Sequence, residues 1–305
     1  MMRQDHRYQK TLKRSVMLDG KGVHTGQPCT LHIHPAPAHH GVVFYRDGQR
    51  LPAHWSFVCD TRNATTLGHL GGASMSMVEH ILAACYGMGI SNLSIECIGS
   101  EVPISDGSAS VFVDLFISAG IQIHSLETSW IVIKETITLQ DGIRMIQFSP
   151  GWPQLTTSLL VGKTVHQHSF YPLIDPFEKD IAPARTFAQL HDVEDLRAQG
   201  LIKGGSLSSA LVLKGSNPIN SGGFRFPNEC ARHKLLDLMG DLATLGHFFY
   251  GQINTVHTGH SLNHRMIAHL MQQPHLFDIV SFKDLPKQKQ TAFSKAPVHR
   301  SRISF

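Results

Sequence analysis

Residues 232–241 carry three side chains that could share one task. His233, Asp237 and Asp241 recur every four residues, so they lie on one face if this segment is a helix. An imidazole and a carboxylate one helical turn apart can both reach a single zinc ion. A helix whose polar face merely happens to contain these residues is the alternative, and the segment alone leaves both interpretations open.

Glu79 and His80 form a second candidate pair. Adjacent side chains on a helix point about 100° apart. His80 could therefore be a third metal ligand while Glu79 stands beside the metal without binding it. A carboxylate in that place can take a proton from metal-bound water. A glutamate and a histidine exposed on a helix surface would give the same sequence.

His260 and Thr186 could complete such a site. His260 follows a glycine at the start of an expected helix, where it could be a general acid that Asp241 orients and keeps protonated. Thr186 offers a hydroxyl that could stabilise an oxyanion. A histidine that only caps a helix and an ordinary threonine remain alternatives. As a set, these residues supply what metal-assisted amide hydrolysis requires, namely three zinc ligands with one position open to water, a base, an acid and a hydroxyl donor.

Hydrophobic periodicity predicts the elements that must position these residues. Alternation with period two predicts strands at residues 29–34 and 92–98 and from Trp130 onward, with a hairpin turn at 140–142. Helical periodicity predicts helices at residues 77–88, 108–119, 228–247 and 261–272. The sequence Asp106-Gly107-Ser108 is a capping signal for the second of these helices.

Each half of the chain runs from strands to helices, which predicts an α+β protein with two domains of similar plan, each a sheet packed against helices. A polar stretch at residues 124–129 separates the halves, so we expect a first domain at 1–125 and a second at 126–305. The two halves share no convincing sequence repeat.

Composition narrows the class of protein. The 305 residues suit two domains, and 42% hydrophobic with 16% charged residues is typical of globular proteins. The net charge of +4 and the lack of a basic cluster argue against a nucleic-acid partner, but a small anionic substrate is compatible. The five scattered cysteines indicate free thiols in a reducing compartment. Without a signal peptide or an apolar run of roughly 18 residues, we expect a cytoplasmic protein that has no transmembrane segment.

A series of short motifs extends from about Thr11 to Pro297. In order, they are Gly22-Val23-His24-Thr25-Gly26, Pro35-Ala36-Pro37, Val78-Glu79-His80, Glu101-Val102-Pro103-Ile104-Ser105-Asp106-Gly107-Ser108-Ala109, Ala184-Arg185-Thr186-Phe187, Gly204-Gly205-Ser206, Arg232-His233-Lys234, Gly240-Asp241-Leu242 and Gly259-His260-Ser261-Leu262-Asn263. This series resembles the UDP-3-O-acyl-N-acetylglucosamine deacetylases, which are zinc-dependent hydrolases of lipid A and lipopolysaccharide biosynthesis in Gram-negative bacteria.

The resemblance implies roles for individual residues. It implies an active site between two α+β domains, with one Zn²⁺ per chain, and Fe²⁺ suits similar ligands. The implied zinc ligands are His80, His233 and Asp237. The implied catalytic residues are Glu79 as general base, His260 as general acid positioned by Asp241, Thr186 as the group that polarises the acetyl carbonyl, and Lys234 beside the metal.

Substrate contacts follow from the same resemblance. An insert is expected near residues 60–72, and another near 187–213 that forms an apolar passage for the acyl chain. The passage is expected to draw on Leu190, Leu196, Leu201, Ile202, Leu207, Ala210 and Leu211. The expected substrate-binding residues are Phe187, Lys234, Leu201, Gly205 and Ser206.

The implied reaction is hydrolysis of the N-acetyl group of UDP-3-O-acyl-N-acetylglucosamine to UDP-3-O-acyl-glucosamine and acetate, by a monomer. The chain departs from the family pattern at residues 161–168 and at Ala188-Gln189, where relatives commonly carry a second aromatic residue. These departures motivate an alternative, a related deacetylase of another acylated or nucleotide-linked amino sugar. A non-catalytic binding protein is a further alternative, although every catalytic group is retained.

Overall fold

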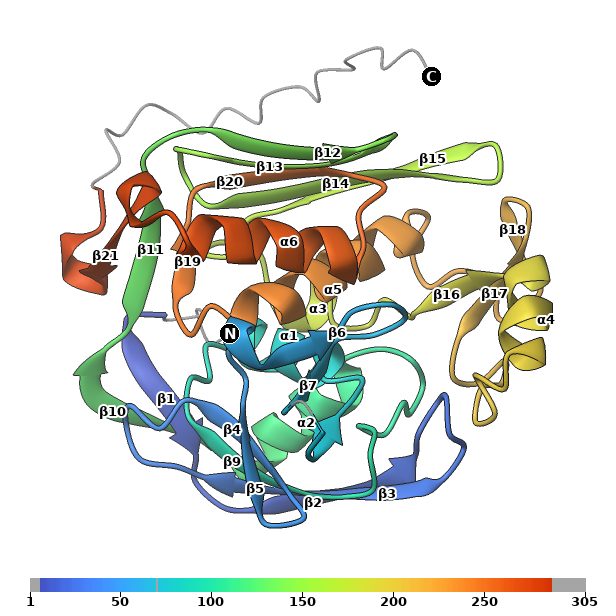
Figure 1. Cartoon of the computed structure of the whole chain (residues 1–305), viewed down its shortest axis with the longest axis horizontal. Coiled ribbons are helices and arrows are strands. Elements are labelled where there is room, and N and C mark those ends of the chain that lie inside the picture. The colour runs from blue at the N-terminus through green and yellow to red at the C-terminus, as the bar shows by residue number, and fades with distance from the viewer. Residues whose placement is uncertain (1–5, 70, 287–305) are drawn as a thin grey trace.

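The computed structural model describes residues 6–69 and 71–286. The remaining residues of the two expected domains, 1–5, 70 and 287–305, lie outside the described residues. The end of the stretch in which the motifs were sought, near Pro297, lies outside them too. Two five-stranded sheets lie at opposite ends of the molecule, and most of the helices lie between them (Figure 1).

The first sheet has the strand order β2-β3-β9-β4-β5. Its strands are β2 (Val16–Lys21), β3 (Pro28–Pro35), β9 (Leu93–Ile98), β4 (Val42–Arg46) and β5 (Gln49–Pro52). Only β4 and β9 pair in parallel. On β3, Leu31 and Ile33 are buried and alternate with half-buried neighbours, which is why the period-two pattern located this strand correctly.

The second sheet repeats this plan with the order β12-β13-β20-β14-β15. Its strands are β12 (Ile137–Asp141), β13 (Arg144–Ser149), β20 (Gln252–Val256), β14 (Gln154–Val161) and β15 (Thr164–Phe170). In both sheets the central strand comes last in sequence and forms the one parallel pairing.

The helices repeat as well. α1 (Glu79–Met88) precedes the central strand of the first sheet and α2 (Ser110–Ala119) follows it. α5 (Glu229–Ala243) and α6 (His260–Met271) stand in the same relation to the second sheet. This correspondence confirms the expected α+β architecture with two units of similar plan, while the boundary between residues 125 and 126 stays a prediction.

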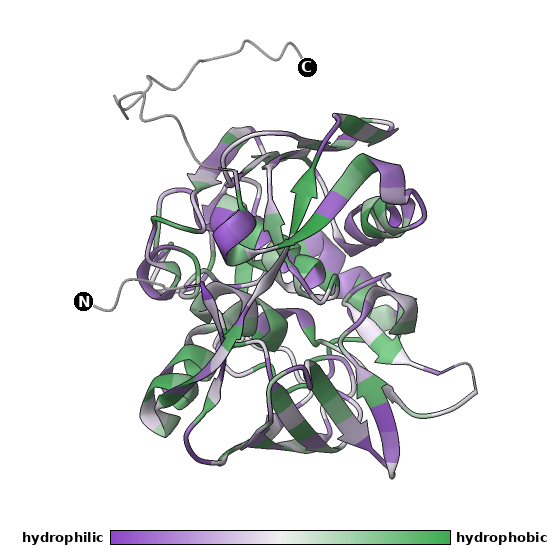
Figure 2. Cartoon of the chain, turned by 90° about the vertical axis from the view of Figure 1, so that its left-hand side faces the viewer, coloured by the Kyte–Doolittle hydropathy of each residue, from purple (hydrophilic) through white to green (hydrophobic). Residues whose placement is uncertain are grey.

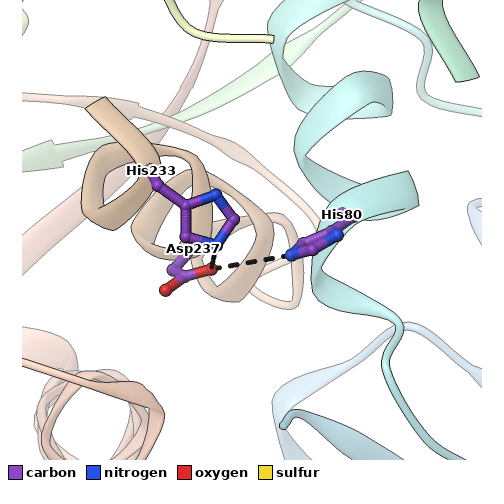
Figure 3. Close-up of side chains that lie close together, drawn as sticks. All are labelled: His80, His233 and Asp237. Atoms are coloured by element: carbon purple, nitrogen blue, oxygen red, sulfur yellow. Dashed lines mark ion pairs between the residues drawn. The ribbon is translucent and has the colours of Figure 1, made fainter. Parts of the chain in front are cut away.

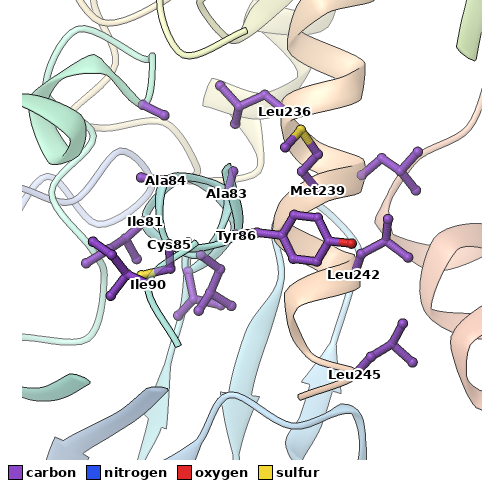
Figure 4. Packing of buried hydrophobic residues seen from close by; sticks show 14 of the residues in the cluster. Ile81, Ala83, Ala84, Cys85, Tyr86, Ile90, Leu236, Met239, Leu242 and Leu245 are labelled. Atoms are coloured by element: carbon purple, nitrogen blue, oxygen red, sulfur yellow. The ribbon is translucent and has the colours of Figure 1, made fainter. Parts of the chain in front are cut away.

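Helices α1 and α5 pack closely against each other at the centre of the molecule (Figure 4). Gly240 makes the approach possible, because a Cβ atom at this position would meet the backbone of Glu79. Buried apolar side chains surround the contact, and each leucine or methionine among them contributes roughly 1.5–3 kcal/mol when fully buried. Those that face the contact include Ala83, Tyr86, Leu236, Met239 and Leu242. The helix pair is therefore a firm base for side chains at its ends.

Smaller elements complete the fold. β1 (Tyr8–Leu12) pairs with β10 (Ile121–Glu127), and β11 (Ser129–Ile133) lies between β19 (Phe248–Tyr250) and β21 (Phe277–Ser281). The first expected insert corresponds to a small sheet of β6 (Val58–Asp60), β7 (Thr66–Gly68) and β8 (Ser74–Met75). The second corresponds to β16 (Phe187–Gln189), α4 (Leu190–Ala198), β17 (Leu211–Lys214) and β18 (Asn217–Pro218). The short helices are α3 (Phe177–Asp180), η1 (Trp55–Phe57), η2 (Pro274–Leu276) and η3 (Phe282–Asp284).

The fold refines two expectations about local structure. Most of the polar stretch at residues 124–129, which was expected to separate the halves, belongs to β10, whose side chains stay largely outside the core, so polarity there marks a surface strand. The helix expected from residue 108 begins at Ser110, because the Asp106 carboxylate accepts the Ser108 N–H within a turn that precedes the helix. Hydrophobic and hydrophilic residues both occur along most strands and helices, whereas β11 is hydrophobic over residues 131–133 (Figure 2). Among the described residues, no helix combines the length and apolar character needed to cross a membrane.

Candidate active site

Helices α1 and α5 bring His80, His233 and Asp237 together (Figure 3). His80 reaches from the first turn of α1 toward Asp237 on α5, and one potential ligand atom from each of the three residues lies within 4.8 Å of the others. The Asp237 Oδ1 atom is 3.3 Å from His233 Nε2 and 3.9 Å from His80 Nε2. All three side chains are buried. The His233 and Asp237 side chains of α5 and the Glu79-His80 pair of α1 thus meet at one point, although the two segments are about 150 positions apart in the sequence.

The protonation states of these residues suit a divalent metal. His233 donates its Nδ1 hydrogen to the Ala184 carbonyl at 3.0 Å, so its Nε2 atom faces the cluster. Burial, together with the nearby His233, lowers the pKa of His80 to about 3, which keeps that ring neutral. Burial raises the pKa of Asp237, but Lys234 and His233 lower it more, and the net pKa lies well below its usual value. Two imidazoles and one carboxylate are a donor set that fits zinc or ferrous iron.

Lys234 lies beside the cluster. Its Nζ donates to Asp237 Oδ2 at 2.8 Å, which leaves Oδ1 as the oxygen that faces the two histidines. Burial lowers the pKa of Lys234, but Asp237 and the other nearby carboxylates raise it by more. The net pKa lies above its usual value, so the side chain remains a cation. The same Nζ is 5.8 Å from the centre of the Phe187 ring.

Glu79 lies at the cluster without joining it. Its Oε2 accepts the Thr65 backbone N–H at 3.0 Å, and its Oε1 is 3.8 Å from His260 Nε2. Burial is the main cause that raises the pKa of Glu79 to about 7, although the neighbouring His260 opposes the rise. A carboxylate with that pKa can accept and release a proton near neutral pH, as a general base must.

His260 on α6 is partly buried and pairs with the fully buried Asp241 on α5. His260 Nδ1 is 2.9 Å from Asp241 Oδ2, and Asn263 donates to the same oxygen at 2.9 Å. Burial lowers the pKa of His260, but Asp241 and Glu79 raise it more, to a net value of about 10. The ring is therefore protonated at neutral pH, with Nδ1–H bound to Asp241 and Nε2–H on the side of Glu79.

A polar cavity of about 340 Å³ opens over these groups. Its lining includes Glu79, His80, Thr186, Phe187, Lys234, Asp237 and His260. Thr186 is held by its backbone, whose N–H donates to the Gly107 carbonyl at 2.7 Å. The preceding residue, Arg185, makes two hydrogen bonds to the buried Glu229 carboxylate, at 2.8 and 3.0 Å. That ion pair ties the Thr186 segment to the first residue of α5.

A second, mainly apolar cavity of about 360 Å³ lies beneath the second insert. It shares Asn63, Met77, Thr186 and Phe187 with the polar cavity, so the two spaces adjoin. Its other lining residues include Leu190, Val193, Leu196, Ile202, Gly205, Ser206, Leu207, Ala210 and Val212. Two of the residues expected in the passage do not line this cavity. Leu201 is absent from the lining, although its neighbour Ile202 is part of it, and Leu211 is fully buried in a small core under the insert.

Several residues of the site escaped the sequence reasoning. Arg62 and Arg144 also line the polar cavity, and the Arg62 guanidinium is paired with Asp60 at 2.7 Å. Thr65 and His264 both contact Asp241. The spacing of His264, four residues after His260 on one helix face, was a usable signal. Thr65 had none, because 176 positions separate it from Asp241.

Comparison with known proteins gives a consistent result. The family model described as UDP-3-O-acyl N-acetylglycosamine deacetylase matches residues 9–272. Curated relatives named UDP-3-O-acyl-N-acetylglucosamine deacetylase include one from Myxococcus xanthus, 39% identical over 92% of this chain and 91% of its own length. One from Syntrophotalea carbinolica is 37% identical over 90% and 91%, and one from Haemophilus influenzae is 36% identical over 95% and 98%.

Proposed function

The chain belongs to the family of UDP-3-O-acyl-N-acetylglucosamine deacetylases, and from this premise we propose that the cavity over α1, α5 and α6 is the active site that cleaves the acetamide of that substrate. Membership makes the protein a hydrolase of lipid A biosynthesis that acts on an amide bond. The convergence of Glu79, His260 and the His80–His233–Asp237 cluster in one cavity is the observation that carries the proposal.

For the metal we propose one zinc ion per chain, held by His80, His233 and Asp237. Ferrous iron would fit the same three ligands. When bound, the metal would supply Lewis-acid polarisation of a water molecule and of the acetyl carbonyl. Lys234 keeps Asp237 oriented for this role through its hydrogen bond to the second carboxylate oxygen.

Proton transfers fall to two side chains that face the same space. Glu79 Oε1 takes a proton from the attacking water as the oxygen adds to the acetyl carbon. His260 gives its Nε2 proton to the amide nitrogen as the C–N bond breaks, and acetate and an amine leave. The 3.8 Å between Glu79 Oε1 and His260 Nε2 suits two groups that serve the same tetrahedral carbon. Asp241 stabilises the charged ring of His260, and the Thr186 hydroxyl donates to the carbonyl oxygen as it gains charge.

The two adjoining cavities suit the two ends of the substrate. The apolar cavity would take the 3-O-acyl chain, with Gly205, Ser206 and Leu201 in the loop that borders it and Phe187 at its junction with the polar cavity. Lys234, Arg62 and Arg144 would face the anionic diphosphate.

We further propose that the chain acts as a monomer in the cytoplasm. Both units of one chain supply residues to the site, with Glu79 and His80 from expected domain 1–125 and the other ligands from 126–305. Four of the five free cysteines are buried, which suits a reducing compartment.

The experiment is a substrate panel with purified, zinc-loaded protein. We expect acetate release from UDP-3-O-acyl-N-acetylglucosamine and far slower release from UDP-N-acetylglucosamine, which lacks the acyl chain that would fill the apolar cavity. Equal rates on both substrates would refute the acyl-chain assignment. No acetate from either substrate would refute the deacetylase assignment and direct the search to another amino sugar.

A further inference from the structure

Thr65 touches both halves of the proposed acid–base machinery. It lies immediately before β7 and is fully buried. Its backbone N–H donates to Glu79 Oε2 at 3.0 Å, and its carbonyl accepts the N–H of Val78, the residue before α1, at 3.3 Å. Its hydroxyl lies 2.6 Å from Asp241 Oδ1 on α5. One residue therefore contacts the carboxylate of the proposed base and the carboxylate that holds the proposed acid.

The direction of the hydroxyl bond follows from its partners. Asp241 is ionised, since His260 and His264 outweigh the effect of burial and hold its pKa far below the usual value. A carboxylate can only accept hydrogen bonds, and 2.6 Å is typical of a hydroxyl that donates to one. The Thr65 hydroxyl therefore donates to Asp241. Its oxygen remains 3.2 Å from His260 Nδ1 and 3.1 Å from His264 Nε2.

This donor completes the surroundings of Asp241. Oδ1 receives Thr65 and also lies 3.0 Å from His264 Nε2, while Oδ2 receives Asn263 and His260. With both oxygens occupied, the carboxylate cannot rotate without breaking a bond, so Oδ2 stays aimed at His260 Nδ1. The Thr65 N–H fixes Glu79 in the same way and leaves its Oε1 toward His260.

We propose that Thr65 is a positioning residue that ties the general base to the general acid, because its backbone sets Glu79 and its hydroxyl sets Asp241. The proposal rests on the proposed roles of Glu79 and His260. Thr65 itself lines neither the polar nor the apolar cavity and makes no contact with substrate in this assignment.

Substitutions that differ by the hydroxyl alone test the proposal. Thr65→Val keeps the size of the side chain and removes the donor, Thr65→Ser keeps the donor, and Thr65→Ala matches the serine variant apart from the hydroxyl. Thr66→Val is the control, because the Thr66 hydroxyl bonds Ser76 instead of Asp241. Each variant is assayed in its zinc-loaded form for kcat, KM and metal content, and thermal melting shows that it is folded.

We expect Thr65→Val and Thr65→Ala to lower kcat by about 10- to 100-fold with zinc content unchanged, as removal of a supporting hydrogen-bond partner typically does. KM should stay within about twofold, because no substrate contact is lost. Thr65→Ser and Thr66→Val should retain nearly the full rate. If the serine and alanine variants are equally active, or equally impaired, the hydroxyl has no positioning role and the proposal is overturned.

A second readout does not depend on turnover. In protein labelled with ¹⁵N-histidine, the Nδ1–H resonance of His260 reports its bond to Asp241. We expect that resonance to shift and to exchange faster with water in Thr65→Val but not in Thr66→Val; an unchanged resonance would also overturn the proposal. Because this signal needs no substrate, a wild-type protein that releases no acetate would refute the proposed function and still leave the Thr65 contact testable.

Discussion

Gly240→Ala should disturb catalysis from a position that touches no substrate. The added Cβ would lie 2.8 Å from the carbonyl carbon and 2.9 Å from the Cα of Glu79, whereas relaxed carbon–carbon contacts are about 3.5–4.0 Å. The Glu79 carbonyl oxygen is closer still to the added Cβ, so helices α1 and α5 would have to separate by roughly 1 Å to relieve the contact. Glu79 and His80 lie on one helix, and His233 and Asp237 lie on the other. The separation would therefore move the base and one metal ligand away from the other two ligands.

Two magnitudes follow for Gly240→Ala. Overpacking of this kind costs about 1–3 kcal/mol of unfolding free energy. A displacement approaching 1 Å at the reacting groups lowers the rate by up to about 100-fold. Urea unfolding and acetate release measure the two effects. Gly222→Ala is the matched control, because no atom lies within 4 Å of the added Cβ and the φ angle of Gly222 lies outside the left-handed region. A variant with wild-type stability and rate would refute the close packing of α1 on α5.

Three further outcomes are expected. Glu79→Ala should lower turnover by about 10²- to 10⁴-fold and leave the metal bound, and loss of metal would instead make Glu79 a ligand. His233→Ala should weaken zinc binding by more than about 100-fold in a competition titration with a chelator, and unchanged zinc content would count against the ligand set. The rate should rise as Glu79 loses its proton and fall as His260 loses its proton, at or below their pKa values of about 7 and about 10, because a bound cation favours both the carboxylate and the neutral ring. A pH–rate profile that is flat from about pH 5 to 9 would contradict acid–base catalysis.

Local sequence patterns predicted the parts of this molecule that depend on local physics. The apolar spacing of Ile81, Leu82 and Cys85 predicted α1, and the four-residue spacing of His233 and Asp237 predicted one shared helix face. Residue type and spacing also named the candidate site residues, but their roles came from the family resemblance, since the spacing alone left a non-functional interpretation open.

The features that escaped prediction depend on tertiary contacts. The reason why a glycine stands at position 240 is visible only once α1 crosses it. The bond from Thr65 to Asp241 joins segments 176 positions apart, so no window of sequence contains it. The surface strand β10 was not predicted because much of it is polar, and only its pairing with β1 identifies it as a strand.

The measurement that tests the central claim most directly is a metal titration of the apoprotein. Zinc is removed with a chelator and added back in known amounts, and acetate release from UDP-3-O-acyl-N-acetylglucosamine is followed at each step. We predict no release without metal and a rate that rises linearly until one zinc is bound per chain, the number that the His80–His233–Asp237 cluster would hold. Full activity of the metal-free protein would contradict the account.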